Sequence, residues 1–127
     1  MRRLELDGSD FLELLQRVEA LKGVLPVRAH GTSMGRSLPT DSALVLEPID
    51  GQAVRPGDVV LCRAGPRLLL HRAREITPVG VMIQGDALPV PDGRFSFGDI
   101  VARVRGSVPR HGVRATLRSL WRSLWSA

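Results

Sequence analysis

The sequence has few of the residues on which several common classes of protein depend. Aromatic residues make up only 4% of the 127 residues, and none lies among the mid-chain arginines, so the stacking platforms of single-strand nucleic-acid binders are missing. The net charge of +5 comes from arginines that are spread along the chain, since Lys22 is the only lysine. The single cysteine, Cys62, excludes an internal disulfide and a cysteine-based metal cluster. We therefore expect no nucleic-acid partner, and a packed, unpaired thiol at Cys62.

Long apolar runs are missing as well. The longest, 43–46, 59–62 and 68–70, fall far below the roughly 18 residues that a membrane-spanning helix needs. The first residues, Met-Arg-Arg-Leu, resemble the basic start of a signal peptide, but any apolar stretch after them is interrupted by four acidic residues, namely Glu5, Asp7, Asp10 and Glu13. The sequence predicts neither an export signal nor a spanning helix, and so a cytoplasmic or peripherally membrane-associated protein.

The length of 127 residues is enough for one domain with one core. Apolar residues at helical spacing predict an amphipathic helix over 10–22, which Gly23 ends. Short runs rich in Val, Leu and Ile predict strands over 27–30, 43–47, 58–63, 67–72, 79–84 and 100–105, with turns at 55–58 and 64–66. Because several of these runs hardly alternate apolar with polar residues, we expect a mainly β protein, built as a curled antiparallel sheet or half-barrel covered on both faces.

The end of the chain has a different pattern. Arg114, Arg118 and Arg122 recur every four residues, and Trp121 and Trp125 fall on the apolar side of the same helical wheel. This predicts a basic amphipathic helix, which can lie on an anionic membrane or pack on its own domain or a second copy. The predicted organisation is a helix and lead-in over 1–26, a main domain over 27–106, and a linker with the C-terminal helix over 107–127.

The segment Gly31-Thr32-Ser33-Met34 places a serine just after a predicted strand and before the flexible Gly35. A serine hydroxyl becomes a nucleophile only beside a base that takes its proton and donors that hold the developing oxyanion. Taken alone, these four residues fit a serine in a turn equally well. The order of the motifs further along the chain is more informative.

Five motifs occur in an order that resembles the type I signal peptidase superfamily. They are Gly31-Thr32-Ser33-Met34 with the apolar strand after it, Pro56-Gly57-Asp58, His71-Arg72, Gln84-Gly85-Asp86-Ala87, and the final strand opened by Phe97-Gly98-Asp99. The resemblance covers about residues 27 to 105, and the candidate base lies 38 residues after the candidate nucleophile. It implies a sheet of the signal peptidase type and a serine endopeptidase that cleaves a leader, signal or propeptide from a peptide or protein precursor.

Members of that superfamily use either lysine or histidine as the general base. The only lysine, Lys22, precedes the nucleophile in the predicted helix, so the resemblance leaves His71. A histidine can take the proton of Ser33 around neutral pH and return it to the leaving amine. A carboxylate behind the imidazole would fix its tautomer. The resemblance gives this role to Asp86 or Asp92; Asp86 is preferred, because the proline and glycine beside Asp92 also suit a turn.

The resemblance also implies that Gly31, Thr32 and Met34 line the oxyanion hole and the substrate groove, with the amide of Ser33 as the main donor. His30 is a competing base, but alternation along the predicted strand turns it away from Ser33. Arg36 and Ser37 stand where the superfamily usually has a proline. No pair of histidines or carboxylates has metal-ligand spacing, and we expect neither a metal nor a cofactor.

Two other functions are compatible with the same residues. One is a non-catalytic module that keeps the fold and grips a peptide without cutting it; it predicts that Ser33 and His71 lie out of hydrogen-bond reach. The other is a membrane-surface adaptor that acts through the C-terminal segment. The serine peptidase explains more of the motifs, and it is the function that we predict.

Overall fold

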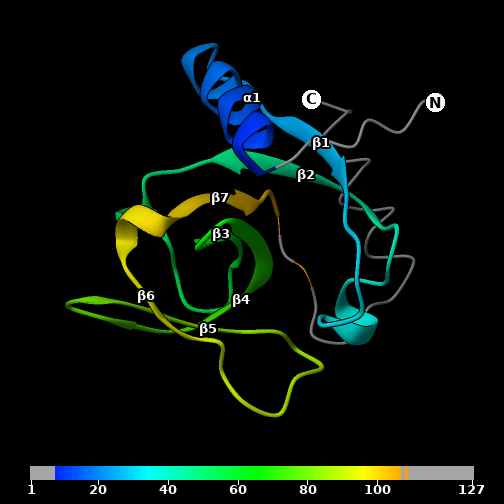
Figure 1. Cartoon of the computed structure of the whole chain (residues 1–127), viewed down its shortest axis with the longest axis vertical. Coiled ribbons are helices and arrows are strands. Elements are labelled where there is room, and N and C mark those ends of the chain that lie inside the picture. Colours follow the sequence, from blue (N-terminus) through cyan, green and yellow to red (C-terminus); the bar gives the residue numbers. More distant parts are fainter. Residues whose placement is uncertain (1–7, 107, 109–127) are drawn as a thin grey trace.

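The computed structural model describes residues 8–106 and 108, and Figure 1 gives its arrangement. The elements in chain order are α1 (Gly8–Ala20), β1 (Leu25–Arg28), the 3-10 helix η1 (Gly35–Ser37), β2 (Ala43–Pro48), η2 (Gly51–Ala53), β3 (Val59–Ala64), β4 (Arg67–Thr77), β5 (Gly80–Gln84), β6 (Gly93–Phe95), η3 (Phe97–Asp99) and β7 (Ile100–Val104). The prediction of a mainly β protein with a helix near its start is confirmed.

The strands form one antiparallel sheet of seven strands in the order β1-β2-β7-β3-β4-β5-β6. No pairing joins β1 to β6 within the described residues, so the sheet is not closed. The sheet curls, and β3 and β4 come to lie in the middle of the molecule while α1 covers β2 (Figure 1). This curl brings the loop after β1 and the loop after β5 toward each other.

Two turns are formed by the residues that predict them. Gly65 and Pro66 connect β3 to β4 as a two-residue hairpin, and Gly65 has the positive φ of 61° that the first position of such a turn requires. Before β3, the amide of Asp58 donates to the carbonyl of Arg55 at 3.1 Å, and Gly57 has φ of 94°. That pattern is a type II turn, in which glycine takes the third position at no steric cost.

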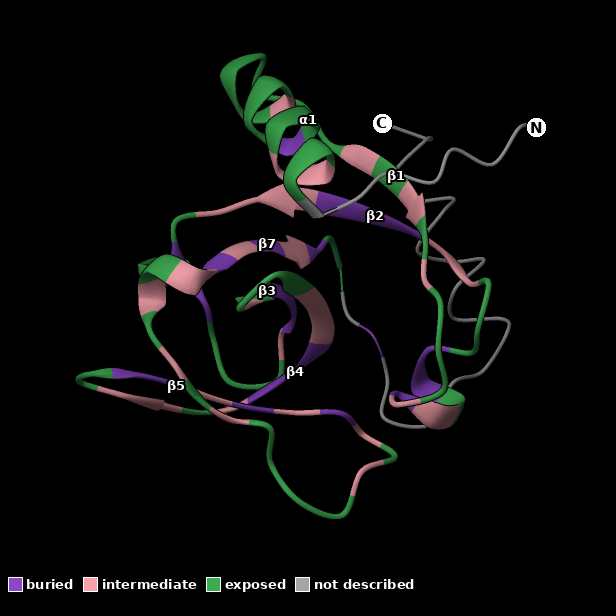
Figure 2. Ribbon diagram, in the orientation of Figure 1, coloured by how far each residue is buried: buried purple, intermediate pink, exposed green. Residues whose placement is uncertain are grey.

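The central strand β3 is buried on both faces. Val59 and Leu61 join one part of the core, with Leu15 of α1, whereas Val60 and Cys62 join a second part beneath β5. Figure 2 shows buried residues along β2 and in parts of β7, β3 and β4. Burial on both faces explains why the run 59–62 is continuously apolar instead of alternating.

The structure differs most from the sequence prediction at three strands. The predicted strand 27–30 lies two residues earlier, as β1 (Leu25–Arg28). The predicted strand 67–72 continues as β4 to Thr77, with a shift of register between Ala73 and Glu75 where it pairs with β5. A bulge of this kind interrupts the alternation of side chains, so the charged residues after Arg72 are not typical of a strand. The short β6 was not predicted, because three residues give too little pattern.

The predicted C-terminal helix over 107–127 lies outside the described residues, and so do Arg114, Arg118, Trp121, Arg122 and Trp125. In the part of the chain that the structure describes, no helix is both long enough and apolar enough to cross a membrane. The helix α1 packs Phe11 and Leu15 against the core, as an amphipathic helix at a domain surface does.

Candidate active site

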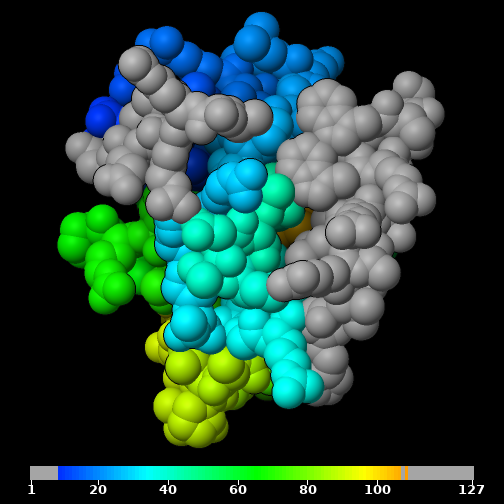
Figure 3. All heavy atoms as spheres, turned by 90° about the vertical axis from the view of Figure 1, so that its right-hand side faces the viewer, coloured from blue at the N-terminus to red at the C-terminus, as the bar shows by residue number. Residues whose placement is uncertain are grey.

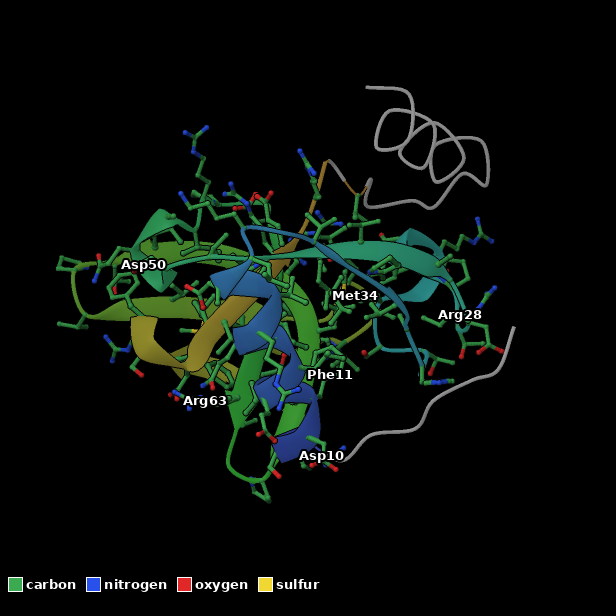
Figure 4. All side chains as sticks on the ribbon, turned by 90° about the horizontal axis from the view of Figure 1, so that it is seen from above. Asp10, Phe11, Arg28, Met34, Asp50 and Arg63 are labelled. Carbon is green, nitrogen blue, oxygen red and sulfur yellow. The ribbon has the colours of Figure 1, made fainter. Side chains whose placement is uncertain are left out.

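Ser33 lies in the loop between β1 and β2, in a turn that buried neighbours hold against the core. The amide of Gly35 donates to the carbonyl of Thr32 at 2.9 Å, and η1 begins directly after this turn. Met34 and Leu38 are each 3% exposed and pack in the part of the core that contains β2. Figure 4 shows Met34 on the inner side of this segment. The position of Ser33 is thus set by residues that flank it.

The loop after β5 holds Ser33 from the other side. The amide of Ala87 donates to the carbonyl of Ser33 at 2.8 Å. Figure 3 shows the two segments, cyan and yellow-green, side by side on one surface. A Cβ atom at Gly85 would lie 2.6 Å from the carbonyl oxygen of Ser33 and 3.2 Å from Nε2 of His71. Only glycine allows this close approach, which explains why the Gly-Asp motif has glycine at position 85.

His71 extends from β4, where it pairs with Val60 of β3, and its side chain is 6% exposed. Its Nε2 lies 2.7 Å from Oγ of Ser33, and its Nδ1 lies 2.5 Å from Oδ2 of Asp92. Because a carboxylate can only accept, Nδ1–H donates to Asp92. The remaining nitrogen, Nε2, is then free to accept the hydroxyl proton of Ser33. The three side chains form the arrangement of a Ser-His-Asp triad.

Asp92 belongs to the loop between β5 and β6. Its amide donates to the carbonyl of Ile83 at 2.8 Å, and the next residue, Gly93, has φ of 130°. The backbone therefore turns sharply at this point, and the carboxylate faces His71 with 19% of its side chain exposed. The sequence favours Asp86 over Asp92 as the residue that orients His71, because the proline and glycine beside Asp92 also suit a turn. The structure has both: Asp92 sits in a turn and contacts the imidazole.

Asp86, which the sequence favoured for orienting His71, binds Arg72 instead. Nε of Arg72 donates to the two carboxylate oxygens at 2.9 and 3.2 Å, and Nη2 donates to Oδ2 at 2.8 Å. The side chains are 5% and 7% exposed. The prediction that Asp86 orients His71 is therefore wrong, and the alternation of side chains along β4 explains why. Arg72 points to the face opposite that of His71, and it pairs with Gln84 of β5. Asp86 lies two residues beyond Gln84 and so reaches the face of Arg72.

The pair of Arg72 and Asp86 connects four motifs of the sequence. Nη1 of Arg72 donates to the carbonyl of Gly57 at 2.8 Å, which ties the Pro-Gly-Asp turn to β4. The amide of Asp86 donates to Sδ of Met34 at 3.4 Å, next to Ser33. Burial raises the pKa of Asp86, but hydrogen bonds from Arg72 and Ser37 and the charge of Arg72 outweigh it, so the pKa lies below its ordinary value. Ser37 is fully buried beside this pair.

A groove of about 440 Å³ opens beside Ser33 and His71. Gly31, Thr32 and Met34 are among its lining residues, and Met34 contributes from a buried position. Within the described part of the chain, no backbone carbonyl accepts the amide N–H of Ser33. A second hollow of about 400 Å³ near α1 has no serine, cysteine or histidine in its lining.

His30 also lines the groove, but it does not contact Ser33 within hydrogen-bond distance. Its Nδ1 lies 3.5 Å from Oδ1 of Asp41, and about half of each side chain is exposed, 56% and 54%. The alternation argument used for His30 does not apply, because β1 ends at Arg28 and the chain has already left the strand. Among the described residues, no group of three or more His, Cys, Asp and Glu side chains could hold a metal ion.

Cys62 lies on β3, buried behind the site. Burial, followed by the negative charges of Asp92 and Asp99, raises the pKa of its thiol to about 12. We expect the thiol to react with a disulfide reagent at pH 8 roughly 10³-fold more slowly in the folded protein than after unfolding in guanidinium, since only the thiolate is nucleophilic. The rate of thionitrobenzoate release measures this. Equal rates in both states would contradict the burial of β3.

Comparisons with protein-family models, with curated proteins and with solved structures gave no match. The geometry brings together Ser33, His71 and Asp92, and it separates Asp86 from them.

Proposed function

We propose that the protein is a serine endopeptidase, in which Ser33 is the nucleophile, His71 the general base and Asp92 the group that orients His71. The observation that carries the proposal is the pair of contacts of His71, 2.7 Å to Ser33 and 2.5 Å to Asp92. A buried histidine bonded on one side to a carboxylate and on the other to a serine hydroxyl is the arrangement that activates serine. The non-catalytic alternative required these side chains to be apart.

The proposed reaction uses the chain's own groups at each step. Nε2 of His71 takes the hydroxyl proton of Ser33 while Oγ attacks the carbonyl carbon of the peptide. The amide N–H of Ser33 donates to the resulting oxyanion, and Asp92 stabilises the imidazolium. His71 then gives the proton to the leaving amine as the C–N bond breaks. A water molecule, deprotonated by His71, releases the acyl group and restores Ser33.

The substrate in this proposal is an extended peptide. The residues of β4 from Arg67 to Leu70 pair only with β3 among the described residues, because the pairing with β5 begins at Arg72. The free edge of this half of β4 forms one wall of the groove, and Ala29 to Thr32 form another. An added strand can satisfy such an edge by backbone hydrogen bonds. The edge leads directly to His71.

The order of motifs supports a finer proposal, that the enzyme is of the signal peptidase type and removes a leader or propeptide. Arg72 and Asp86 belong to two of these motifs and contact Gly57 and Met34 of two others, so that four of the five are connected. Each of these four motifs therefore has a contact in the network beside the proposed nucleophile. Attachment to a membrane or partner through Arg114, Arg118, Trp121, Arg122 and Trp125 remains part of the proposal from the sequence.

Labelling with a fluorophosphonate tests the proposal. The full chain should be modified at Ser33, as located by mass spectrometry of peptides, because the reagent needs an activated serine. Ser33→Ala should abolish the modification, and His71→Ala should slow it by roughly 10⁴-fold or more. Ser96→Ala is the matched control, because Ser96 is exposed and donates to Asp99 away from the groove.

The outcome against the proposal is specific. If the wild-type protein neither reacts with the reagent nor cleaves any member of a proteome-derived peptide library, Ser33 is not an activated nucleophile. If labelling persists in His71→Ala at the wild-type rate, the base is another group. The first result would leave the groove as a binding site without peptidase chemistry, whereas the second would overturn only the role of His71.

A further inference from the structure

The groove beside Ser33 has an uneven distribution of charge. Three of its lining side chains can carry a charge, namely His30, Arg67 and His71, and all three can only become positive. No aspartate or glutamate lines the groove within the described residues. The carboxylate of Asp92 lies behind His71, and Asp41 pairs with His30 outside the lining. Arg67 is thus the cation of the lining that has no nearby carboxylate.

Arg67 is the first residue of β4, directly after the hairpin of Gly65 and Pro66, and it is exposed. No hydrogen bond or ion pair joins its guanidinium to another residue in the described part of the chain. By contrast, the guanidinium groups of Arg72 and Arg103 both bind carboxylates. The guanidinium is therefore available to a ligand in the groove.

The position of Arg67 relative to the nucleophile can be derived from strand geometry. Residues 67, 69 and 71 project to the same face of β4, because side chains alternate along a strand. At about 3.3 Å per residue, Arg67 lies about 13 Å along the strand from His71. A peptide strand paired with the free edge of β4 places a side chain opposite each of these residues. The peptide residue opposite Arg67 is thus four positions from the one opposite His71.

From these observations we infer that Arg67 determines specificity, by binding an acidic side chain of the substrate about four residues from the scissile bond. This inference rests on the proposed peptidase function and deepens it, since it names a substrate class: peptides with aspartate or glutamate at that position. A guanidinium suits a carboxylate because two parallel N–H donors match its two oxygens. Between these two positions, the middle peptide residue lies opposite Leu69 on the same face, whereas Leu68 and Leu70 project to the other face and pack against the core.

A peptide library tests this inference. The full-length protein is incubated with a library of proteome-derived peptides, and the cleavage sites are aligned by mass spectrometry. We expect acidic residues to be enriched roughly fivefold or more at one position about four residues from the cleaved bond. In Arg67→Ala this enrichment should disappear, and in Arg67→Glu it should be replaced by enrichment of lysine and arginine. Arg94→Ala, which removes an exposed arginine on β6 outside the groove, should keep the wild-type preference.

Binding gives a second readout that does not need cleavage. The Ser33→Ala protein is immobilised, and the library peptides that it retains are sequenced, with and without Arg67→Glu in addition. Retention of acidic peptides that reverses with Arg67→Glu supports the inference even if the wild type cleaves nothing, which would overturn only the proposed function. Cleavage without acidic preference, or with a preference that Arg67→Glu leaves unchanged, overturns the inference and keeps the function.

Discussion

Asp92→Asn should lower the rate of fluorophosphonate labelling, and of peptide cleavage, by about 10⁴-fold while the protein stays folded. The carboxylate accepts Nδ1–H of His71 at 2.5 Å and so keeps Nε2 free to take the proton of Ser33. An asparagine amide can donate to Nδ1 instead, which moves the ring proton to Nε2 and leaves Ser33 without a base. It also removes the negative charge that stabilises the imidazolium. Labelling kinetics measure the loss of rate, and circular dichroism shows whether the protein stays folded.

The matched control for Asp92→Asn is Asp50→Asn. Asp50 caps η2 by accepting from the amide of Gln52 at 2.8 Å, a role that asparagine also performs. Its labelling rate should equal that of the wild type. The assignment of Asp92 would be wrong if Asp92→Asn kept its rate within tenfold while a stable Asp86→Asn protein lost it, because Asp86 would then be the orienting group.

The strands could be predicted because their side chains carry local signals. The runs 59–62 and 68–70 are apolar because they lie in a curled sheet, and Gly65 and Gly57 mark turns that need positive φ. The extension of β4 to Thr77 had no such signal, since its charged residues come after a bulge. Periodicity fails where the backbone itself changes register.

The candidate site was predictable only in part. Ser33 and His71 stand out by the order of motifs, whereas the choice between Asp86 and Asp92 depends on which face of the sheet each reaches. That choice is determined once Arg72 is paired with Gln84, because neighbours on a strand point to opposite faces. His71 and Arg72 must then find partners on different sides. Pairing between strands joins residues that are far apart in the chain, so a local pattern in one sequence does not predict it.

Asp86→Ala should destabilise the protein by about 3–5 kcal/mol, because it leaves the guanidinium of Arg72 buried without a charge partner. The side chain of Arg72 is 5% exposed, so water cannot replace the carboxylate. Urea unfolding monitored by far-UV circular dichroism measures the loss. The double variant Arg72→Met with Asp86→Leu is the control, and it should recover most of the stability since no unpaired charge remains. A loss below about 1 kcal/mol for Asp86→Ala, the range of exposed ion pairs, would contradict the burial of this pair.

Because the pKa of Asp86 is lowered, the stability that this ion pair contributes depends on pH. A carboxylate whose pKa is lower in the folded state than in the unfolded state adds stability that is complete above the unfolded pKa, near the ordinary 3.8. That stability is lost as the pH falls from this value through the folded pKa. The wild type should therefore lose stability more steeply below about pH 4 than the double variant, which lacks the carboxylate. Parallel acid profiles would mean that Asp86 is not held ionised by Arg72, and the link between the Gly-Asp motif and the loop of Ser33 would need another explanation.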